Sequence, residues 1–189
     1  QTVCCPDCGP SYRLVADGVE TVDSAIPGFA DKLQNGAIGV AKSWGGMHIC
    51  CTLDNIPKLR RWYGRENKPF AIMVRDLDAA RRYSDPDDDE IAALCSSQRP
   101  IVLVPKKDGP RTEDASPGLD TLGLFLPYTG MQHLLFEHLH VDALVMTSAN
   151  VPGEPMILDD ENVMAMGADA YLLHDQRIIN RADDSVIRM

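Results

Sequence analysis

Short apolar runs recur along the chain and are separated by more polar segments. The runs lie at residues 37–40, 70–74, 101–104, 122–126, 143–146 and 170–173. Each contains four or five residues without a clear polar alternation, which is typical of strands that are buried on both faces. The pattern predicts the strands of one sheet.

Several of the intervening segments have the spacing of helices. Apolar residues recur at helical spacing from Thr21 to about Asn35, in a predicted helix that starts or kinks at Pro27. Residues 56–63, which end before Gly64, and residues 77–83 predict two more helices. Helices that alternate with strands predict an α/β fold.

Two polar segments are less regular. Residues 85–90 hold five carboxylates, which favour a solvated loop or a helix start over a metal site. Residues 106–117 are rich in Lys, Asp, Gly and Pro, and they predict a mobile connection.

Composition and charge narrow the class of protein. The chain has 189 residues, of which 44% are hydrophobic, as expected for one domain with a sizeable core. The formal net charge of -10 argues against nucleic acid as a partner, so a phosphate ligand has to meet a local basic cluster. The sequence contains no membrane-length apolar run and no leader-like start, which predicts a cytoplasmic protein without a membrane partner.

The six cysteines predict reduced thiols rather than a disulfide scaffold, because the chain is too large for a small secreted domain. Cys5 and Cys8 form one C-x-x-C pair, which is half of a structural zinc site. Cys50 and Cys51 are predicted to be buried, so we expect the half-site to hold no zinc here. Because the chain begins with Gln1 and ends soon after an apolar pair, we expect a piece of a longer protein.

A glycine loop follows the first predicted strand. It reads Lys42-Ser43-Trp44-Gly45-Gly46-Met47-His48. Glycines let backbone N–H groups approach an anion closely, and Lys42 adds a charge, so the loop is a candidate phosphate cradle. A plain turn with a structural His48 is the alternative.

A basic cluster stands out in this acidic chain. Arg60 and Arg61 complement the C-terminal dipole of a helix, whereas Arg65 and Lys68 lie beyond Gly64. Guanidinium and ammonium groups suit phosphate oxygens, which makes Arg65 and Lys68 candidate ligand-binding residues.

Two further clusters of polar residues lie next to apolar runs, one after a run and one before. Ser148 and Asn150 come after the strand at 143–146, where ligands of open α/β sheets collect, although both are also common turn residues. The segment from Arg181 to Ser185 offers two carboxylates and a hydroxyl for magnesium, or a simple turn.

Other nucleotide and hydrolase motifs are missing. The sequence contains no G-x-x-x-x-G-K-[ST], G-x-G-x-x-G or G-x-S-x-G. His133, His138 and His140 form no H-E-x-x-H pair, and they are predicted on or beside a helix.

Seven segments, taken in order, resemble the YrdC-like domain of HypF hydrogenase maturation carbamoyltransferases, preceded by the end of their zinc-finger region. They read CCPDCGP, KSWGGMHICC, ENKPFAIMV, RPIVLV, SPGLDTLGLFLPYTGMQHLL, LVMTSANVPGEP and RADDSVIR. The resemblance implies a zinc-finger remnant at residues 1–14 and a YrdC-like nucleotide-binding domain at 15–189. It also implies an open twisted mixed sheet flanked by helices.

The resemblance implies a reaction as well. In such enzymes carbamate released from carbamoyl phosphate is joined to ATP, which gives carbamoyl adenylate and pyrophosphate. A further domain passes the carbamoyl group to the C-terminal cysteine of HypE, and it becomes a cyanide ligand of [NiFe]-hydrogenase. This chain resembles only the adenylate-forming part, with ATP and magnesium as cofactors and zinc in the full-length family.

Matched to the family motifs, the clusters acquire roles. The resemblance implies that Arg65 and Lys68 bind the ATP phosphates. It implies that Lys42 and the backbone of Gly45 and Gly46 line the carbamate or phosphate pocket beside His48.

Ser148 and Asn150 match the S-x-N residues of the nucleotide site. Arg181, Asp184 and Ser185 match a closing loop.

Two departures from the family pattern are visible. Tyr63 stands where the family has a lysine before Arg65, and Gln176 with Arg177 stands where an arginine and then an acid are usual. Two alternatives remain: a threonylcarbamoyl-adenylate synthase for tRNA modification, and a nucleotide-binding module without turnover. The C-x-x-C pair and the DDSVIR segment favour the HypF-type enzyme.

Overall fold

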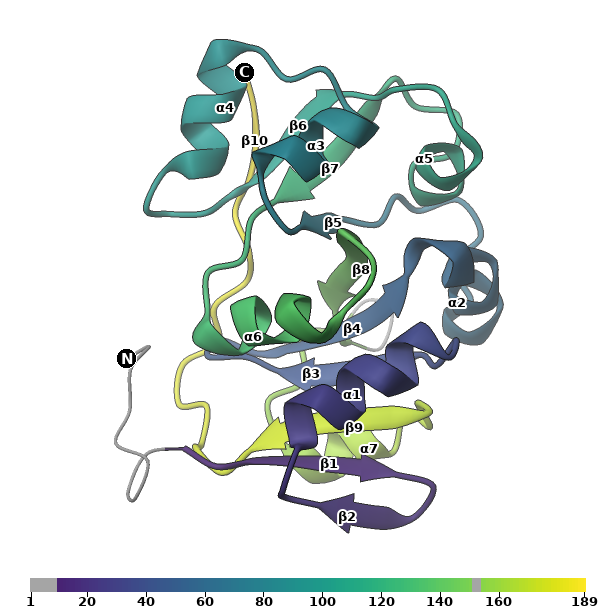
Figure 1. The fold of residues 1–189 in the computed structure, drawn as a ribbon, viewed down its shortest axis with the longest axis vertical. Coiled ribbons are helices and arrows are strands. Elements are labelled where there is room, and N and C mark those ends of the chain that lie inside the picture. The colour runs from purple at the N-terminus through teal and green to yellow at the C-terminus, as the bar shows by residue number, and fades with distance from the viewer. Residues whose placement is uncertain (1–9, 151–153) are drawn as a thin grey trace. The chain divides into compact units, whose positions relative to one another are not determined.

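The computed structural model describes residues 10–150 and 154–189, and the chain divides into two compact units. The first unit consists of Gln1–Cys50, Thr129–His140 and Ser148–Asp183. The second consists of Cys51–Tyr128, Val141–Thr147 and Asp184–Met189. Each unit contains a mixed set of paired strands and its own helices (Figure 1).

The sheet of the first unit has the strand order β4-β3-β9-β1-β2. Strand β3 pairs parallel with β9, and the other pairs are antiparallel. The strands are β1 (Tyr12–Ala16), β2 (Val19–Thr21), β3 (Gly39–Lys42), β4 (Met47–Thr52, of which residues 47–50 belong here) and β9 (Ala170–His174).

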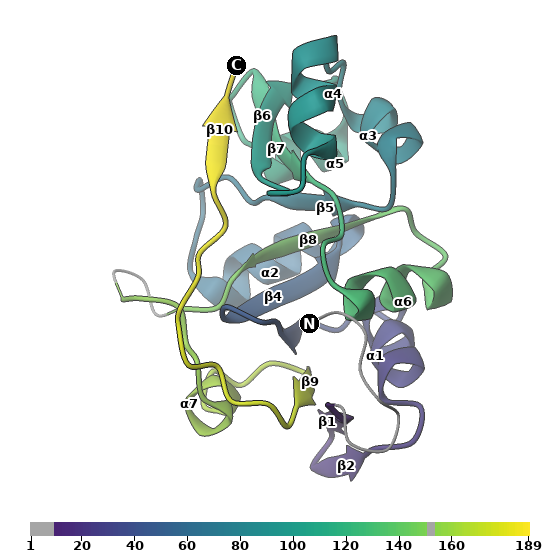
Figure 2. The same ribbon diagram turned by 90° about the vertical axis from the view of Figure 1, so that its left-hand side faces the viewer.

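Three helices cover this sheet. Helices α1 (Ala25–Gln34) and α6 (Gly130–His138) lie on one side of it, and α7 (Asp160–Met164) lies on the other (Figure 2). Phe29 and Leu33 of α1 are fully buried, as are Ile38 and Ile49. The apolar stripe of α1 thus packs into the core of the unit.

The sheet of the second unit has the order β10-β6-β7-β5-β8. Its strands are β5 (Ile72–Val74), β6 (Ile101–Pro105), β7 (Thr121–Phe125), β8 (Ala143–Ser148) and β10 (Val186–Arg188). Its helical elements are η1 (Leu53–Asn55), α2 (Ile56–Tyr63), α3 (Leu77–Tyr83), α4 (Asp88–Cys95) and α5 (Pro110–Ala115). The pairs β10–β6 and β5–β7 are parallel, and β6–β7 and β5–β8 are antiparallel.

The α/β prediction is confirmed, and the six predicted strands and three predicted helices are present. The acidic run at 85–90 is a helix start: Asp87 caps α4 and forms a reciprocal pair of hydrogen bonds with Glu90. His133 and His138 lie in α6, as expected.

Two predictions need correction, and three strands were missed. The helix expected from Thr21 begins at Ala25, because Thr21 pairs with Leu14 in the β1–β2 hairpin. Residues 106–117 are not a plain connection, because they contain α5, and Thr112 donates a hydrogen bond to the carbonyl of Lys107. Strands β1, β2 and β4 were not predicted, and the proposed domain boundary between residues 14 and 15 stays a prediction.

Among the described residues, no helix is long and apolar enough to cross a membrane. Cys50, Cys51 and Cys95 form no disulfide, and Cys50 and Cys51 are fully buried, as predicted. Burial raises the pKa of Cys51 to about 12, so its thiolate is disfavoured. Cys5 and Cys8 lie outside the described residues.

Candidate functional site

The glycine loop connects β3 to β4 as a tight hairpin in the first unit. Ser43 N–H donates to the carbonyl of Gly46 at 2.8 Å and closes the turn. Ala182 N–H donates to the carbonyl of Gly45 at 3.0 Å. A Cβ atom on Gly45 would lie 2.6 Å from the Cβ and carbonyl oxygen of Ala182, so only glycine permits this approach.

Gly46, the second glycine of the loop, packs against the segment that contains Met156. A Cβ on Gly46 would lie 2.3 Å from the methyl group of Met156. Arg181 Nε donates to the carbonyl of Met156 at 3.0 Å. Three predicted motifs, far apart in the sequence, are therefore brought together here: the glycine loop, the segment after Asn150, and the start of the RADDS segment.

Ser148 and Asn150 lie at the end of β8 and just after it. The Ser148 hydroxyl donates to the Asn150 side-chain carbonyl at 3.1 Å, and the Asn150 amide donates to the carbonyl of Glu154 at 3.0 Å. The pair therefore shapes its own loop, which is the turn role left open above. Its contact with a nucleotide stays a prediction.

Lys42 ends β3 with only 5% of its surface exposed. Its ammonium pairs with Asp160 at 2.8 Å and donates to the carbonyl of His174 at 3.0 Å. Arg13 binds the other carboxylate oxygen of Asp160 at 2.7 Å. Two of the three N–H donors of Lys42 are thus directed at protein acceptors among the described residues, and its contact with a ligand stays a prediction.

His48 lies within β4, paired with Ala41 of β3. It is 3% exposed, as expected for a structural histidine. Its predicted place beside a phosphate pocket remains a prediction.

Arg65 and Lys68 lie in the second unit, in the basic loop (residues 64–69) that follows α2. Gly64 ends α2 in the left-handed conformation, with φ of 65°. Arg60 holds the loop: its Nη1 donates to the carbonyls of Arg65 at 2.9 Å and Lys68 at 3.0 Å. The two predicted phosphate-binding residues are thus fixed through their own backbones.

Other contacts immobilise Arg60. Its Nε donates to the carbonyl of Asp114 at 3.0 Å, and its guanidinium lies 4.6 Å from the ring centroid of Phe70. Burial lowers the pKa of Arg60, while the Asp114 charge acts in the opposite direction. Arg60 is therefore a structural clamp rather than a solvated helix-end cation.

Asp184 and Ser185 open the segment that enters β10. The carbonyl of Ser185 accepts from Ile101 N–H at 2.8 Å and starts the pairing with β6. Asp184 is half-buried and Ser185 is exposed. The boundary between the two units falls between Asp183 and Asp184, and the closing role of Arg181, Asp184 and Ser185 stays a prediction.

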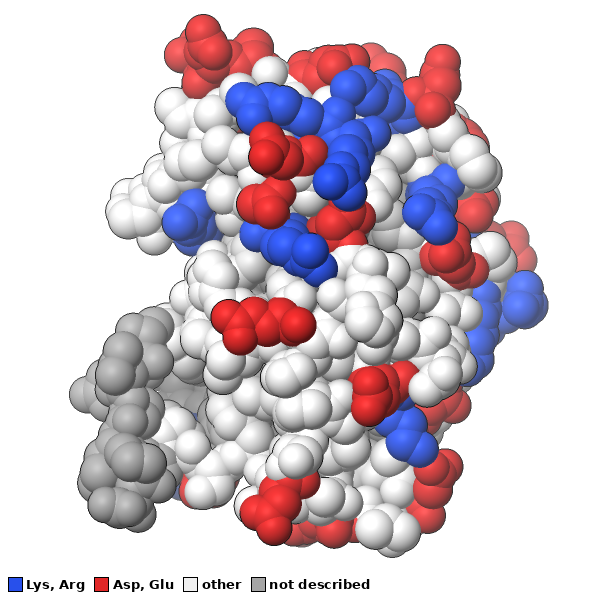
Figure 3. Space-filling model, in the orientation of Figure 1, with Lys and Arg blue, Asp and Glu red and all other residues white. Residues whose placement is uncertain are grey.

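Basic residues are unequally divided between the units. Of the 18 Lys and Arg residues, 13 belong to the second unit and 5 to the first. On the face drawn in Figure 3, the Lys and Arg side chains gather over elements of the second unit and alternate with carboxylates. Most of the basic side chains of this acidic chain therefore belong to the second unit.

A family model for Sua5, YciO and YrdC proteins, described as telomere recombination, matches residues 31–189. The chain belongs to the Sua5/YciO/YrdC family. Within this family it is similar to carbamoyltransferase HypF of Rhodobacter capsulatus, with 40% identity over all of this chain and 26% of that protein. HypF2 of Cupriavidus necator is 43% identical over 90% of this chain and 24% of its own length. The chain spans about a quarter of these relatives.

Solved structures agree with the sequence relatives. A crystal structure of full-length HypF in its phosphate- and nucleotide-bound form matches the whole chain with a TM-score of 0.91 and 38% identity, over 25% of that protein. HypF from T. kodakarensis matches 97% of the chain with a TM-score of 0.92 and 40% identity, again over 25% of its length. P. abyssi Sua5 shares the fold, with a TM-score of 0.74 at 15% identity. The predicted resemblance to the YrdC-like domain of HypF is confirmed.

The structure also explains one departure from the HypF pattern. The guanidinium of Arg65 lies over the ring of Tyr63, and Tyr63 stacks on Trp62. A cation–π contact of this kind orients Arg65. Tyr63 therefore supports the neighbouring arginine at the position where a lysine was expected.

Three residues that hold the basic loop and Lys42 in place were not predicted from the sequence. Arg60 was interpreted as a helix-end cation, and Asp160 and His174 were not singled out. Asp160 follows Asp159, which caps the short helix α7, and such a cap signal is weak without the structure. His174 ends β9, directly after a predicted strand, and that position was its only signal.

Proposed function

We propose that this chain forms carbamoyl adenylate from carbamate and ATP, as the adenylate-forming segment of a HypF-type carbamoyltransferase in the cytoplasm. The observation that carries the proposal is the basic loop, in which Arg60 fixes the backbones of Arg65 and Lys68. Similarity to a nucleotide-bound HypF over the whole chain supports a nucleotide as its ligand.

The reaction needs no covalent enzyme intermediate. A carbamate oxygen attacks the α-phosphorus of ATP, and the bond from that phosphorus to the bridging oxygen of the β-phosphate breaks. Pyrophosphate leaves with the electron pair of that bond, and no proton has to move. The demands on the protein are alignment of the two anions and stabilisation of the charge that grows on pyrophosphate.

In this proposal Arg65 and Lys68 supply that stabilisation. A guanidinium suits two phosphate oxygens at once, whereas an ammonium acts as a compact charge. Because Arg60 and Tyr63 already hold Arg65 in place, little side-chain freedom is lost when the phosphates bind. Lys42, Gly45, Gly46 and His48 remain proposed for the carbamate end.

Ser148 and Asn150 remain proposed for the nucleotide, and Arg181, Asp184 and Ser185 for closure over it.

Magnesium would accompany ATP. Among the described residues no group of three or more His, Cys, Asp or Glu side chains is arranged to hold a metal ion. We propose an ion held mainly by phosphate oxygens and water, with Asp184 as its protein contact. When bound, the ion would screen the repulsion between carbamate and the triphosphate.

The later steps require parts of a HypF-type enzyme beyond this chain, which spans about a quarter of such proteins. Release of carbamate from carbamoyl phosphate and transfer of the carbamoyl group to HypE, for cyanide ligand synthesis, are proposed for the longer enzyme. Zinc is proposed only for that longer enzyme, with Cys5 and Cys8 as half of a site.

Exchange of labelled pyrophosphate into ATP tests the substrate. We expect exchange with ATP, magnesium and carbamate, and none with threonine plus bicarbonate or with ATP alone. Exchange that depends on threonine would replace the proposal by a threonylcarbamoyl-adenylate synthase. Absence of exchange in every arm, together with tight ATP binding, would replace it by a nucleotide-binding module.

A further inference from the structure

His174 holds the start of the glycine loop at two points. It ends β9, the strand that pairs parallel with β3. Its backbone carbonyl accepts from the Lys42 ammonium at 3.0 Å, and its ring Nε2 lies 3.3 Å from the carbonyl oxygen of Ser43. Because a carbonyl oxygen only accepts, Nε2 carries the proton and donates it. The last residue of β3 and the first residue of the loop are thus both bound to one residue.

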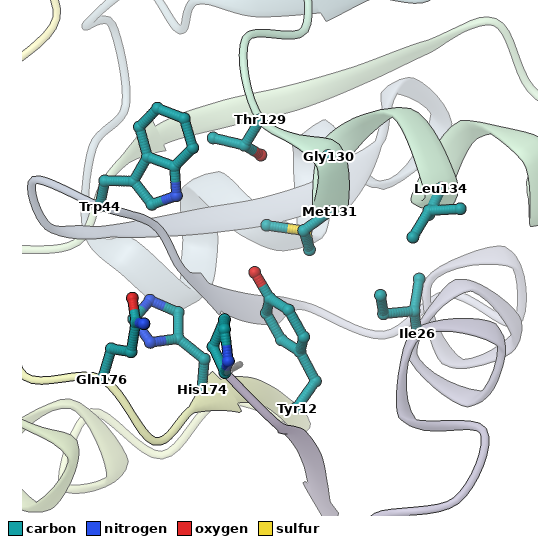
Figure 4. Close-up of a pocket in the computed structure, with 10 residues that line it drawn as sticks. Tyr12, Ile26, Trp44, Thr129, Gly130, Met131, Leu134, His174 and Gln176 are labelled. Carbon is teal, nitrogen blue, oxygen red and sulfur yellow. The ribbon is translucent and has the colours of Figure 1, made fainter. Parts of the chain in front are cut away.

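The glycine loop borders open space rather than a packed core on one side. A pocket of about 270 Å³ lies there, within the first unit, and both Trp44 and His174 line it (Figure 4). Figure 4 shows His174 and Tyr12 side by side below Trp44, and Trp44 is 42% exposed. Groups that border a cavity lack packing contacts on that side. The hydrogen bond from His174 to Ser43 therefore carries more of the burden of fixing the loop.

Packing alone does not explain a histidine at this position. The preceding residues of β9, Ala170 to Leu173, belong to the buried hydrophobic core, and His174 itself is only 4% exposed. Its ring meets that of Tyr12 edge-on at 5.7 Å, and its Nδ1 has no hydrogen-bond partner within the described residues. A buried imidazole with one unsatisfied nitrogen costs free energy that an apolar side chain would not. What the imidazole adds is the N–H that it directs at the loop.

The surroundings favour the neutral ring that this arrangement needs. Burial lowers the pKa of His174, and the charge of Lys42 on β3 also lowers it. The Ser43 carbonyl and the carboxylates of Asp160 and Asp175 act in the opposite direction. A neutral imidazole has a single N–H, and here that N–H is the one bound to the loop.

We propose that His174 is a positioning residue for the carbamate end of the site, through the glycine loop. It fixes the Ser43 carbonyl, and with it the direction in which the backbone N–H groups of the following residues point. Ala182 binds the carbonyl of Gly45 from the other end of the loop, so the loop is held at both ends. His174 itself does not touch the substrate. This inference rests on the proposed function, which places carbamate beside the glycine loop.

His174→Gln and His174→Asn form a matched pair of test variants. The amide nitrogen of glutamine lies as many bonds from Cα as Nε2, and that of asparagine as many as Nδ1, so only glutamine reaches the Ser43 carbonyl. Both variants keep the contact with Lys42, because it uses the backbone carbonyl. In pyrophosphate exchange at pH 8 we expect the KM for carbamate to rise about fivefold in His174→Asn and to stay within about twofold in His174→Gln. The KM for ATP should stay within about twofold in both.

The amide signal of Trp44 provides a readout that needs no turnover. Its nitrogen shares a peptide group with the Ser43 carbonyl, so its chemical shift responds to the hydrogen bond that this carbonyl accepts. In correlation spectra of the full chain we expect the Trp44 amide signal to move in His174→Asn and to stay near its natural position in His174→Gln. His133→Asn, at an exposed position of α6, is the control and should change neither KM nor the Trp44 signal.

The outcomes separate this inference from the proposed function. If the natural chain exchanges pyrophosphate with carbamate, an unchanged KM for carbamate in His174→Asn, or equal losses in His174→Asn and His174→Gln, would overturn the positioning role alone. An unmoved Trp44 signal in His174→Asn would also overturn it. Absence of carbamate-dependent exchange in the natural chain would overturn the proposed function, and the carbamate role of His174 with it.

Discussion

The guanidinium carbon of Arg65 lies 4.2 Å from the ring centroid of Tyr63. Tyr63 is the last residue of α2, and Gly64 turns the chain so that Arg65 folds back over the ring. Tyr63, which stands where a lysine was expected, thus supports the side chain of Arg65 as an aromatic platform. Arg60 binds the same loop through hydrogen bonds to the backbone carbonyls of Arg65 and Lys68.

Removal of the platform should weaken ATP binding without unfolding the chain. Tyr63→Leu keeps an apolar side chain but removes the aromatic face, which is worth about 0.5–1 kcal/mol to a cation. We expect the KM for ATP to rise by about two- to fivefold with little change in kcat. Tyr63→Phe keeps the ring face and should resemble the natural chain in pyrophosphate exchange kinetics. Equal effects of the two substitutions would contradict the role of the ring.

Loss of the Arg60 clamp should be more damaging. Lysine cannot reproduce a planar fork that reaches the carbonyls of Asp114, Arg65 and Lys68 together. We expect Arg60→Lys to lower the free energy of unfolding by about 2 kcal/mol, measured by urea titration, and to raise the KM for ATP.

The neighbouring Arg61→Lys is the matched control, because Arg61 is exposed at the same end of α2. It should change the free energy of unfolding by less than about 0.5 kcal/mol. A comparable loss in both variants would show that the carbonyl contacts of Arg60 carry no special weight.

The two glycines of the β3–β4 turn should differ in their tolerance of a methyl group. In Gly45→Ala the new Cβ meets the backbone and Cβ of Ala182, whereas in Gly46→Ala it meets the end of the flexible Met156 side chain. Thermal unfolding should show a loss of about 2–3 kcal/mol for Gly45→Ala and of about 1 kcal/mol for Gly46→Ala. The reverse order would mean that the Ala182 segment does not pack on the turn.

The buried histidine predicts a pH dependence of stability. Burial holds the pKa of His174 below its ordinary value of about 6.5, so the unfolded chain takes up a proton at a higher pH than the folded one. This contribution to stability is therefore complete above about pH 6.5 and is lost as the pH falls from there towards the folded pKa. Urea titrations from pH 8 to pH 5 should show a shallower decline in His174→Phe than in the natural chain. Parallel curves would contradict a depressed pKa.

The sequence predicted the local parts of this fold well. Helix α2 ends before Gly64 and α3 spans residues 77–83, both as predicted, because helix spacing and end signals are carried by neighbouring residues. The buried strands β6 and β7 were recognisable as apolar runs. Strands β1 and β2 were not, because β2 is exposed and its pairing with β1 depends on contacts made by the folded sheet.

The candidate site was predictable as a set of residue types but not as an arrangement. Motif order identified Lys42, Arg65 and Lys68. The contacts that fix Lys42 come from Asp160 and from the carbonyl of His174, more than a hundred residues away in the sequence. Such pairs leave no local pattern. The C-terminal dipole of α2 already explained a cation at Arg60. The sequence therefore offered no reason to expect its hydrogen bonds to the carbonyls of Arg65 and Lys68.

The most direct test of the central claim is pyrophosphate exchange into ATP with carbamate as substrate, in the natural chain, Arg65→Ala and Lys68→Ala. If the basic loop stabilises the leaving pyrophosphate, each substitution should reduce exchange by at least about a hundredfold, while circular dichroism shows an intact fold. Exchange at the natural rate in both variants would contradict the assignment of the basic loop to ATP.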